Sequence, residues 1–535
     1  MSSSDLRMSA DLCCTPRRRA MLALLAAGTT PLAWAHGDEA SHAHPISPGG
    51  RDMLTVVGPW ELTGLDPARS GYMFARMEVL QTLLEVDDAG QLRPALARTW
   101  EVSADGLQWR FALQAGGRYH DGSVVTPASV LACLQRAAVR PGVLQLASIT
   151  AMSVQESVLV VSLSKPFGPL PYLLTHYSTQ ILAPSSFDAH GNVVAIVGSG
   201  PFRIQSISLP QQFDVERVAP GPGRAIQRAR YISVSRAETR TLLVQSGQAE
   251  LAFSLDPPSI RALQESPRAR LLSAMLPRTT ILKLNAGHPF LADVRVRRAI
   301  SLCMEREGIA RALLRDPDLG ATQLFPPSLT RWHDPQLAPL HTDLKQARRL
   351  LEEAGWRLGA DGVRWCDGRK LELSLTTFVD RPELPLIATA LQEEMRQIGI
   401  AVRVVIGNSS DIPAGHRSGA LQMALAARNY GNLPEPVASL LQDFGPQGGD
   451  WGAMGWDNTE VPALLARLAQ LPAMPAGDAD GGRAERARIV ALLQEQLPVI
   501  PVVWYRQTCA VSRRLQGASL DPFERSYRLS CLQWI

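Results

Sequence analysis

Hydrophobic and polar residues alternate strictly around Trp109, which is the pattern of a β-strand with one buried face. Trp109, Phe111 and Leu113 alternate with more polar neighbours, so we expect them to face a core. Residues 103–106, Ser-Ala-Asp-Gly, have the composition of a tight turn that follows an earlier strand. The pattern therefore predicts two paired strands over about 100–113.

Capping residues and apolar positions spaced by three or four predict several helices. Thr126 followed by Pro127 is typical of a helix start, and we expect this helix to end near Ala138. Further helices are expected over 294–307 after Asp293, over 344–354 after Asp343, and over 384–398.

Strand-like and helix-like segments alternate in the second half of the chain. Residues 371–377 and 402–406 are expected to be strands on either side of the helix at 384–398. This βαβ order is typical of a sheet covered by helices, so the predicted fold class is α/β. Other strands are expected over 54–57, 154–163 and 500–505.

Length and composition describe a folded protein with more than one core. A chain of 535 residues is too long for a single hydrophobic core, so we expect two or three packed units. Hydrophobic residues make up 46% and charged residues 19%, as in ordinary globular proteins. The formal net charge is small, at +4, and implies no basic patch, which argues against nucleic acid as the main partner.

The first 35 residues have the features of an export signal. Three arginines at 17–19 precede a short apolar run at 20–27, and Ala33-Trp34-Ala35 offers a cleavage site. The arginines fit either an ordinary secretory signal or a twin-arginine signal. No cysteine follows the run at a lipoprotein position, and no later stretch is apolar enough to span a membrane. We therefore expect a soluble periplasmic protein.

Residues 36–50 form a polar segment rich in histidine. His36, His42 and His44, close to two carboxylates, could hold a transition metal. A flexible tail must first be ordered, at an entropic cost, so the alternative is a solvated tail without metal.

Five cysteines follow the export signal, an odd number. None belongs to a CxxC pair, which argues against a zinc or redox site. Cys509 and Cys531 could form a disulfide, or they could remain free thiols.

A series of short motifs occurs in a fixed order between residues 96 and 126. The motifs are Leu96-Ala97, Trp100, the turn at 103–106, the strand at 109–113, Tyr119-His120-Asp121-Gly122 and Thr126. This order resembles that of the extracellular solute-binding proteins of family 5, the peptide- and nickel-type receptors of ABC importers. Similar segments at 198–202, 282–310, 343–356 and 455–505 extend the resemblance over nearly all of the chain beyond residue 50.

The resemblance implies a two-lobed periplasmic-binding-protein fold of the cluster C type, with an extra subdomain in the first lobe. The implied boundaries are a signal peptide at 1–35, a tail at 36–50, lobe I at 51–283 plus 505–535 with the subdomain at about 90–200, and lobe II at 284–504. A monomer is expected, without cofactor or catalytic residues. Its expected partners are a small-molecule or peptide solute and an ABC permease and ATPase complex at the inner membrane.

The resemblance also places ligand-binding residues in both lobes. In the first lobe they are Met73 and Phe74, which the helical spacing also allows in a core stripe, together with His176 and Tyr177. In the second lobe they are Arg428, Tyr430, Asn432 and Trp451. For His176, Tyr177, Tyr430 and Trp451 the alternative is packing in the core or at its rim. Aromatic and polar side chains of this kind are typical of a solute-binding cleft.

The same comparison leaves the solute open. Peptide-binding members carry an aspartate near position 432 that pairs with the peptide ammonium, whereas this chain has Asn432, with Glu435 further on. Nickel-type members use an arginine of the first lobe to bind a carboxylate-bearing chelator, and this chain has His176-Tyr177 at that point. A peptide, a metal chelate and a similar polar solute all remain possible.

The function predicted from the sequence is a periplasmic receptor that closes on a solute and delivers it to an ABC importer. One alternative is a secreted hydrolase on the same scaffold, although the sequence offers no GxSxG, HExxH or Cys-His signature. The other alternative is a ligand-sensing domain that does not take part in transport.

Overall fold

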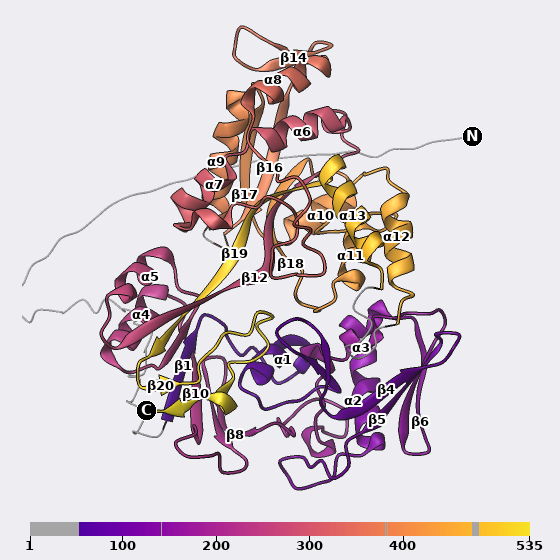
Figure 1. Cartoon of the computed structure of the whole chain (residues 1–535), viewed down its shortest axis with the longest axis vertical. Coiled ribbons are helices and arrows are strands. Elements are labelled where there is room, and N and C mark those ends of the chain that lie inside the picture. Colours follow the sequence, from indigo (N-terminus) through magenta and orange to yellow (C-terminus); the bar gives the residue numbers. More distant parts are fainter. Residues whose placement is uncertain (1–52, 141, 380, 382, 473–480) are drawn as a thin grey trace, which may run out of the picture. The chain divides into compact units, whose positions relative to one another are not determined.

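The computed structural model describes residues 53–535 except 141, 380, 382 and 473–480 (Figure 1). The predicted export signal and the tail with His36, His42 and His44 therefore lie outside the described residues. Among the residues that are described, no helix has the length and apolar character needed to cross a bilayer.

A ten-stranded mixed sheet organises the described chain. Its order is β17 (Ala401–Gly407), β16 (Glu372–Phe378), β18 (Met423–Asn429), β12 (Ala269–Leu284), β19 (Val499–Ser512), β11 (Leu251–Phe253), β1 (Met53–Gly58), β10 (Arg228–Ser233), β9 (Gln212–Arg217) and β8 (Phe202–Ser208). Strand β16 runs parallel to β17 and β18, and β1 runs parallel to β10 and β11. Between these parallel sets, β12 and β19 pair with each other in antiparallel fashion.

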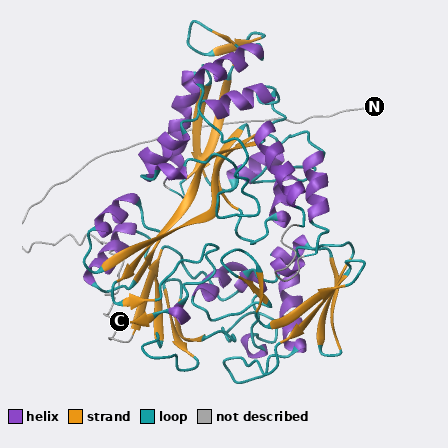
Figure 2. Ribbon diagram, in the orientation of Figure 1, coloured by secondary structure: helices purple, strands orange, loops and turns teal. Residues whose placement is uncertain are grey.

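Smaller sheets and helices surround this sheet (Figure 2). The small sheets contain β4 (Ala97–Val102), β5 (Gln108–Leu113), β7 (Val158–Leu163) and β6 (Ile149–Gln155); β2 (Leu84–Val86) and β3 (Leu92–Pro94); β13 (Arg357–Leu358), β14 (Arg364–Cys366) and β15 (Arg369–Lys370); and β20 (Leu515–Gln516) and β21 (Gln533–Trp534). The helices are α1 (Pro67–Arg76), α2 (Pro127–Ala138), α3 (Leu170–Leu173), α4 (Ala237–Ser246), α5 (Pro257–Gln264), α6 (Val294–Leu302), α7 (Arg306–Ile309), α8 (Leu344–Glu353), α9 (Glu383–Gln397), α10 (Asp411–Ser418), α11 (Val437–Phe444), α12 (Glu460–Leu468) and α13 (Arg483–Gln496).

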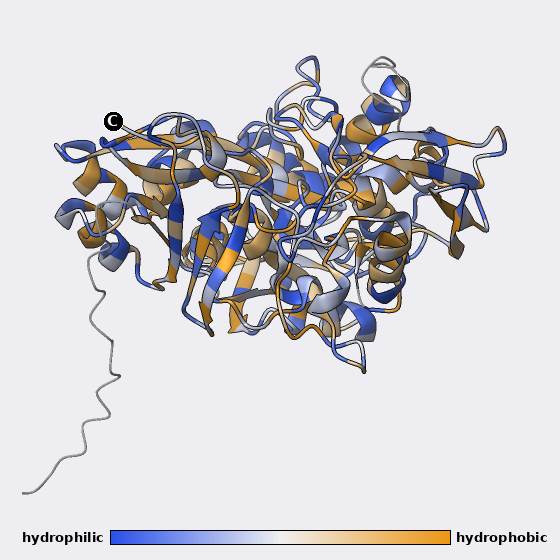
Figure 3. Ribbon diagram, turned by 90° about the horizontal axis from the view of Figure 1, so that it is seen from below, coloured by the Kyte–Doolittle hydropathy of each residue, from blue (hydrophilic) through white to orange (hydrophobic). Residues whose placement is uncertain are grey.

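Two hydrophobic cores form on this framework, and hydrophobic and hydrophilic residues alternate along several of the strands around them (Figure 3). One core contains Leu54 of β1, Phe74 of α1 and Trp109 of β5, all fully buried. The other contains Ile300 of α6 and Leu391 of α9. The long strands β12 and β19 carry the chain between the two cores.

The boundaries of the lobes remain a prediction, because core packing does not follow a single cut in the chain. Helices α11, α12 and α13 lie in the range expected for lobe II. Their residues Leu440, Leu465 and Ile489 nevertheless belong to the same core as Leu54 and Phe74.

Most of the predicted element starts are confirmed. The side chain of Thr126 accepts a hydrogen bond from the backbone N–H of Ser129, and Ser129 completes a capping box at the start of α2. Asp293 caps α6, and Asp343 caps α8, through the same kind of bond. These starts were predictable because short side-chain acceptors satisfy N–H groups that have no partner within the helix.

Two predicted elements need correction. Residues 154–163, expected to be one strand, belong to the β6–β7 hairpin, which turns at Glu156 and Ser157 in the left-handed backbone region. The helix expected over 294–307 ends at Leu302, and Arg306 folds back and donates to the carbonyl oxygen of Ser301 over 2.9 Å. A new short helix, α7, then begins at Arg306.

The cysteines among the described residues are free thiols, so Cys509 and Cys531 do not pair with each other. Cys509 is buried and Cys531 is exposed.

Candidate functional site

A cavity of about 800 Å³ lies where α1, β2, the loop at 175–180, the middle of β12, the end of β18 and the C-terminal segment meet. We use "C-terminal segment" for residues 519–531. Its lining includes Trp60, Tyr72, Arg76, Glu78, Glu85, Asp88, His176, Tyr177, Arg278, Asn429, Asn432, Asp521, Glu524, Arg525, Ser526, Arg528 and Ser530. The volume is within the range of small-molecule sites, roughly 300–1,000 Å³.

Helix α1 presents one face to the core and another to the cavity. Asp66 caps the helix by accepting from the N–H of Ala68, and Pro67 suits the first turn, where no N–H is needed. Met73 and Phe74 are fully buried, whereas Tyr72 and Arg76, four residues apart, line the cavity.

The guanidinium of Arg76 is held in a buried position at the cavity wall. It lies 4.0 Å from the centre of the Trp60 ring, a cation–π contact. Its Nε donates to the backbone oxygen of Glu524 over 3.0 Å, and its Nη2 lies 3.5 Å from Glu524 Oε1. The residue is only 7% exposed, so these contacts fix where its positive charge sits.

Arg278 brings a second guanidinium to the same carboxylate. Its Nη2 donates to Glu524 Oε2 over 2.7 Å, and its guanidinium carbon lies 4.7 Å from the centre of the Tyr505 ring. Arg278 lies within an irregularity of the ladder between β12 and β19, which spans the stretch from Leu276 to Thr279. At this irregularity the carbonyl oxygen of Pro277 accepts from the N–H of Tyr430 over 2.7 Å. Arg278 therefore stands in the middle of β12 at the cavity wall, opposite Asn429 at the end of β18.

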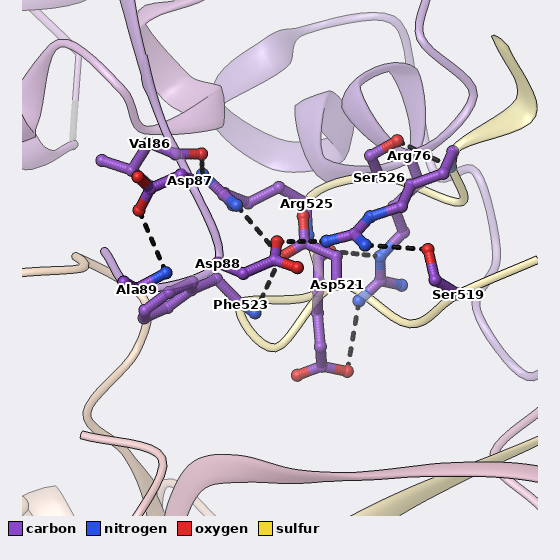
Figure 4. A network of polar contacts seen from close by, with 12 residues as sticks. Arg76, Val86, Asp87, Asp88, Ala89, Ser519, Asp521, Phe523, Arg525 and Ser526 are labelled. Carbon is purple, nitrogen blue, oxygen red and sulfur yellow. Dashed lines mark hydrogen bonds and ion pairs between the residues drawn. The ribbon is translucent and has the colours of Figure 1, made fainter. Parts of the chain in front are cut away.

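The C-terminal segment is tied to the first core by several polar contacts (Figure 4). Arg525 donates to the carbonyl oxygen of Val86 over 2.6 Å and to Asp521 over 3.1 Å, and Arg528 pairs with Asp88. The carboxylate of Glu78 accepts from the hydroxyl of Ser526 and from the N–H of Ser530, each over 2.9 Å. These contacts make the segment a fixed part of the cavity wall.

The backbone at Glu78 is held by a close approach of two chain segments. The backbone φ angle of Glu78 is +57°, a value that residues other than glycine rarely adopt. Its carbonyl oxygen would lie 2.2 Å from a Cβ at Gly200, so only glycine leaves room for this approach. The glycine-rich turn at 198–202 thereby supports the position of the Glu78 carboxylate.

Aromatic rings line another part of the cavity. Tyr72 and Tyr177 meet edge to face, with ring centres 5.9 Å apart, and the rings of His176 and Tyr177 are 4.0 Å apart. Burial lowers the pKa of His176 to about 4, so the imidazole is neutral near neutral pH. This wall offers stacking and hydrogen bonding but no charge.

The structure brings only part of the predicted ligand-binding set together. His176, Tyr177 and Asn432 line the cavity. Met73 and Phe74 lie inside the core instead, and the Phe74 ring packs against Phe213 with centres 6.0 Å apart. Neither of these two side chains lines the cavity, which agrees with the alternative of a core stripe.

The other predicted residues of the second lobe have protein partners. Arg428 donates from Nε and Nη2 to Asp443, over 2.7 and 3.0 Å. Tyr430 is 1% exposed and packs against Phe325, with ring centres 5.1 Å apart. Trp451 packs edge to face against Phe378 at 6.5 Å. None of these three is among the residues that line the cavity.

No set of three or more His, Cys, Asp or Glu side chains within the described part of the chain is arranged to hold a metal ion. The metal-binding prediction for His36, His42 and His44 concerns residues beyond that part and stays a prediction.

Sequence reasoning missed the charged residues of the cavity, chiefly Arg76, Arg278, Glu524, Arg525 and Arg528. A signal was present for one of them, since Arg76 follows Tyr72 by one helical turn and shares its face. No such signal marks the C-terminal segment, because it has no regular secondary structure over most of its length.

Comparison with known proteins gives one family match and many related chains. The family model "Bacterial extracellular solute-binding proteins, family 5 Middle" matches residues 91–451. The nickel-binding periplasmic protein of Escherichia coli K12 is 26% identical over 455 residues, covering 82% of this chain and 84% of that protein. The glutathione-binding protein GsiB of Shigella flexneri is 21% identical over 499 residues, covering 88% and 92%.

Solved structures show the same fold. NikA from Brucella suis in complex with Fe(III)-EDTA matches with a TM-score of 0.80 and 22% identity, over 90% of this chain and all of that chain. The oligopeptide-binding protein AppA from Bacillus subtilis, in complex with a nonapeptide, matches with a TM-score of 0.71 and 18% identity, over 90% and 99%. The predicted α/β, two-lobed periplasmic-binding-protein fold is thereby confirmed.

Proposed function

The chain belongs to the bacterial extracellular solute-binding proteins of family 5, which serve ABC importers, and we propose that it captures its solute in the 800 Å³ cavity. The observation that carries this proposal is the make-up of the cavity wall. Residues of α1 and the C-terminal segment, which pack with the first core, meet Arg278 of the crossing strand β12 and Asn429 at the end of β18. A solute in this cavity therefore contacts elements that pack into each of the two hydrophobic cores.

Capture would proceed by closure of the two predicted lobes around the solute. The long strands β12 and β19 connect the cores and supply the hinge in this proposal. A solute that touches both sides of the cavity binds the closed state more tightly than the open state, and this difference drives closure. The closed receptor, expected to be a monomer exported to the periplasm, then delivers the solute to the permease and ATPase complex.

The solute would be a peptide, a metal chelate or a polar molecule of similar size. The names of the relatives support this range, since they include nickel-binding and glutathione-binding proteins. The lining favours a polar solute because arginines, carboxylates and the amides of Asn429 and Asn432 surround the cavity.

A secreted hydrolase is the less favoured function. One contact could support it, because His176 Nδ1 lies 2.9 Å from the hydroxyl of Ser178. The low pKa of His176, about 4, makes the imidazole a poor general base near neutral pH. No carboxylate among the described residues hydrogen-bonds the other ring nitrogen, so the third group of a catalytic arrangement is missing there.

Thermal unfolding and small-angle X-ray scattering together test the proposed function. We expect at least one solute of the proposed range to raise the melting temperature and to reduce the radius of gyration. No response to any peptide, nickel chelate or polar solute in a broad panel would contradict it. A permease and ATPase that bind the loaded protein would favour transport over a sensing role without transport.

A further inference from the structure

A buried lysine fastens a glycine-rich loop to the crossing strand β12. Lys283 is 1% exposed, and its Nζ donates to the carbonyl oxygens of Gly449 and Gly452 over 2.6 and 2.8 Å. Both carbonyls belong to residues 445–455, which we call the glycine loop. A buried ammonium needs acceptors for all three of its N–H groups, so it requires one more partner besides these two carbonyls.

The remaining partner is the imidazole of His416, in the last turn of α10. Its Nδ1 lies 3.0 Å from Lys283 Nζ. Towards an ammonium, an imidazole nitrogen can only accept, so His416 must then be neutral with its proton on Nε2. If both groups were charged, two positive charges and two sets of donors would face each other across this contact.

The glycine loop packs tightly against the end of α11. A Cβ at Gly449 would lie 2.1 Å from the carbonyl oxygen of Gln442. A Cβ at Gly452 would lie 2.1 Å from the carbonyl oxygen of Asp443, which also accepts from the N–H of Ala453 over 2.8 Å. These contacts fix the loop on the side of α11, and the buried ammonium fixes it on the side of β12.

Four other charged side chains lie around the pair of Lys283 and His416, on elements packed against it: Asp450 of the glycine loop, Arg417 of α10, Asp443 of α11 and Arg428 of β18. They form two ion pairs, Asp450 with Arg417 over 3.2 Å and Asp443 with Arg428 over 2.7 Å. A second positive charge on the lysine and histidine pair is therefore not compensated. Burial and the nearby ammonium hold the pKa of His416 below its ordinary value of 6.5.

We propose that Lys283 and His416 form an acid-sensitive latch, which holds the glycine loop on β12 while at most one of the two groups is charged and releases it when both are. The second proton comes from solvent and becomes an N–H on His416 Nδ1, which can no longer accept from the ammonium. The latch reaches the solute cavity, because Asp443 at the loop binds Arg428, and the next residue, Asn429, lines the cavity. It does not depend on the proposed function, since neither latch residue contacts the cavity.

Hydrogen exchange followed by mass spectrometry tests the latch on the full-length protein. The amides of Gly449, Gly452 and Ala453 are hydrogen-bonded and therefore report opening of the loop. We expect their protection, corrected for the intrinsic exchange rate, to fall about 10-fold or more from about pH 7.5 to about pH 5. The β6–β7 hairpin, which the latch does not contact, serves as the internal reference. Equal protection of the glycine loop at both pH values would overturn the proposal.

The variant H416Q separates titration from the hydrogen bond. The amide oxygen of glutamine can accept from the ammonium at every pH used, so the loop of H416Q should keep its protection within about 3-fold in acid. The matched control is H190Q, which replaces an exposed histidine elsewhere in the chain and should behave like wild type. A loss of protection in H416Q as large as in wild type would overturn the latch, because another group would then be responsible.

The titration of the histidine itself is the second readout. NMR of histidine-labelled protein gives the pKa of His416, whose signal is identified by its absence in H416Q. K283M removes the neighbouring ammonium, so the pKa of His416 should rise by about 1. An unchanged pKa of His416 in K283M would overturn the proposal whatever the loop does, because the two groups would then not be coupled.

Discussion

Arg278 donates from Nη2 to Glu524 Oε2 over 2.7 Å, which joins the crossing strand β12 to the C-terminal segment. Both side chains are 11% exposed, so the pair lies largely out of solvent. The same carboxylate faces Arg76 of α1, so that three distant parts of the chain meet at Glu524. This carboxylate therefore controls both the position of the two arginines and the charge of the cavity.

Replacing Glu524 by glutamine should destabilise the protein. E524Q would leave two buried guanidinium groups without a counter-charge, and we expect the free energy of unfolding to fall by about 2–4 kcal/mol. Urea denaturation followed by circular dichroism measures this change. The matched control is E307Q, whose exposed pair with Arg311 should contribute less than about 0.5 kcal/mol. Equal stability of E524Q and wild type would show that the shared carboxylate is not a structural link.

The fold was predictable because its signals are local and its motifs are ordered. Helix starts are marked by short side chains that accept hydrogen bonds from free backbone N–H groups, as at Thr126, Asp293 and Asp343. The β6–β7 hairpin was missed because Glu156 and Ser157 turn with positive φ angles, and neither residue type signals this conformation. At the end of α6, the side chain of Arg306 folds back and binds the last turn, a contact that the local sequence does not signal.

The site was harder to predict than the fold. His176, Tyr177 and Asn432 were expected at the cavity and line it. The charged residues come from segments that meet only after folding, such as Arg76 and Glu524, which are separated by 448 positions. Most of the charged lining also lies outside residues 91–451, where the family model matches, so the family pattern carries little information about it.

The buried Lys283 should make the free energy of unfolding depend on pH in the alkaline range. Its ammonium, 1% exposed, donates to the carbonyl oxygens of Gly449 and Gly452 over 2.6 and 2.8 Å and lies 3.0 Å from His416 Nδ1. Burial lowers its pKa from 10.5 to about 7, even though Asp443 and Asp450 favour the charged form.

The sign of this dependence follows from proton binding. Between pH 7 and 10.5 the unfolded chain holds a proton on Lys283 that the folded chain has lost, so stability from this residue rises with pH across that window. We expect the free energy of unfolding of wild type to rise by about 3 kcal/mol more than that of K283M over this range. Chemical denaturation at a series of pH values measures both slopes. The same pH dependence of the free energy of unfolding in wild type and K283M would show that Lys283 is not its cause.

Arg428 should act on stability more than on solute binding. Its two bonds to Asp443, which is 2% exposed, form a largely buried ion pair whose members do not line the cavity. R428Q is expected to lower the free energy of unfolding by about 2–4 kcal/mol, because it leaves the Asp443 carboxylate buried and unpaired. Urea denaturation and calorimetry with a bound solute are measured side by side. Normal stability with loss of solute binding would instead support the ligand-binding role expected from the sequence.

Gly200 should tolerate no side chain. A Cβ at this position would lie 2.2 Å from the carbonyl oxygen of Glu78 and 2.7 Å from that of Val79, both parts of the backbone. We expect G200A to lower the free energy of unfolding by about 1–3 kcal/mol and to displace the Glu78 carboxylate from Ser526. The matched control is G64A, where a Cβ meets nothing within 4 Å. Comparable stability of both variants in urea would show that the close approach at Glu78 is dispensable.

Native mass spectrometry of the protein, released from the periplasm of its producing cell, tests the central claim most directly. The claim is that the cavity holds a solute and leaves its bonds unchanged. We expect wild type to carry one additional mass and to release it chemically intact on denaturation. A chain that emerges without a solute, together with steady conversion of an added ester or amide, would contradict the claim.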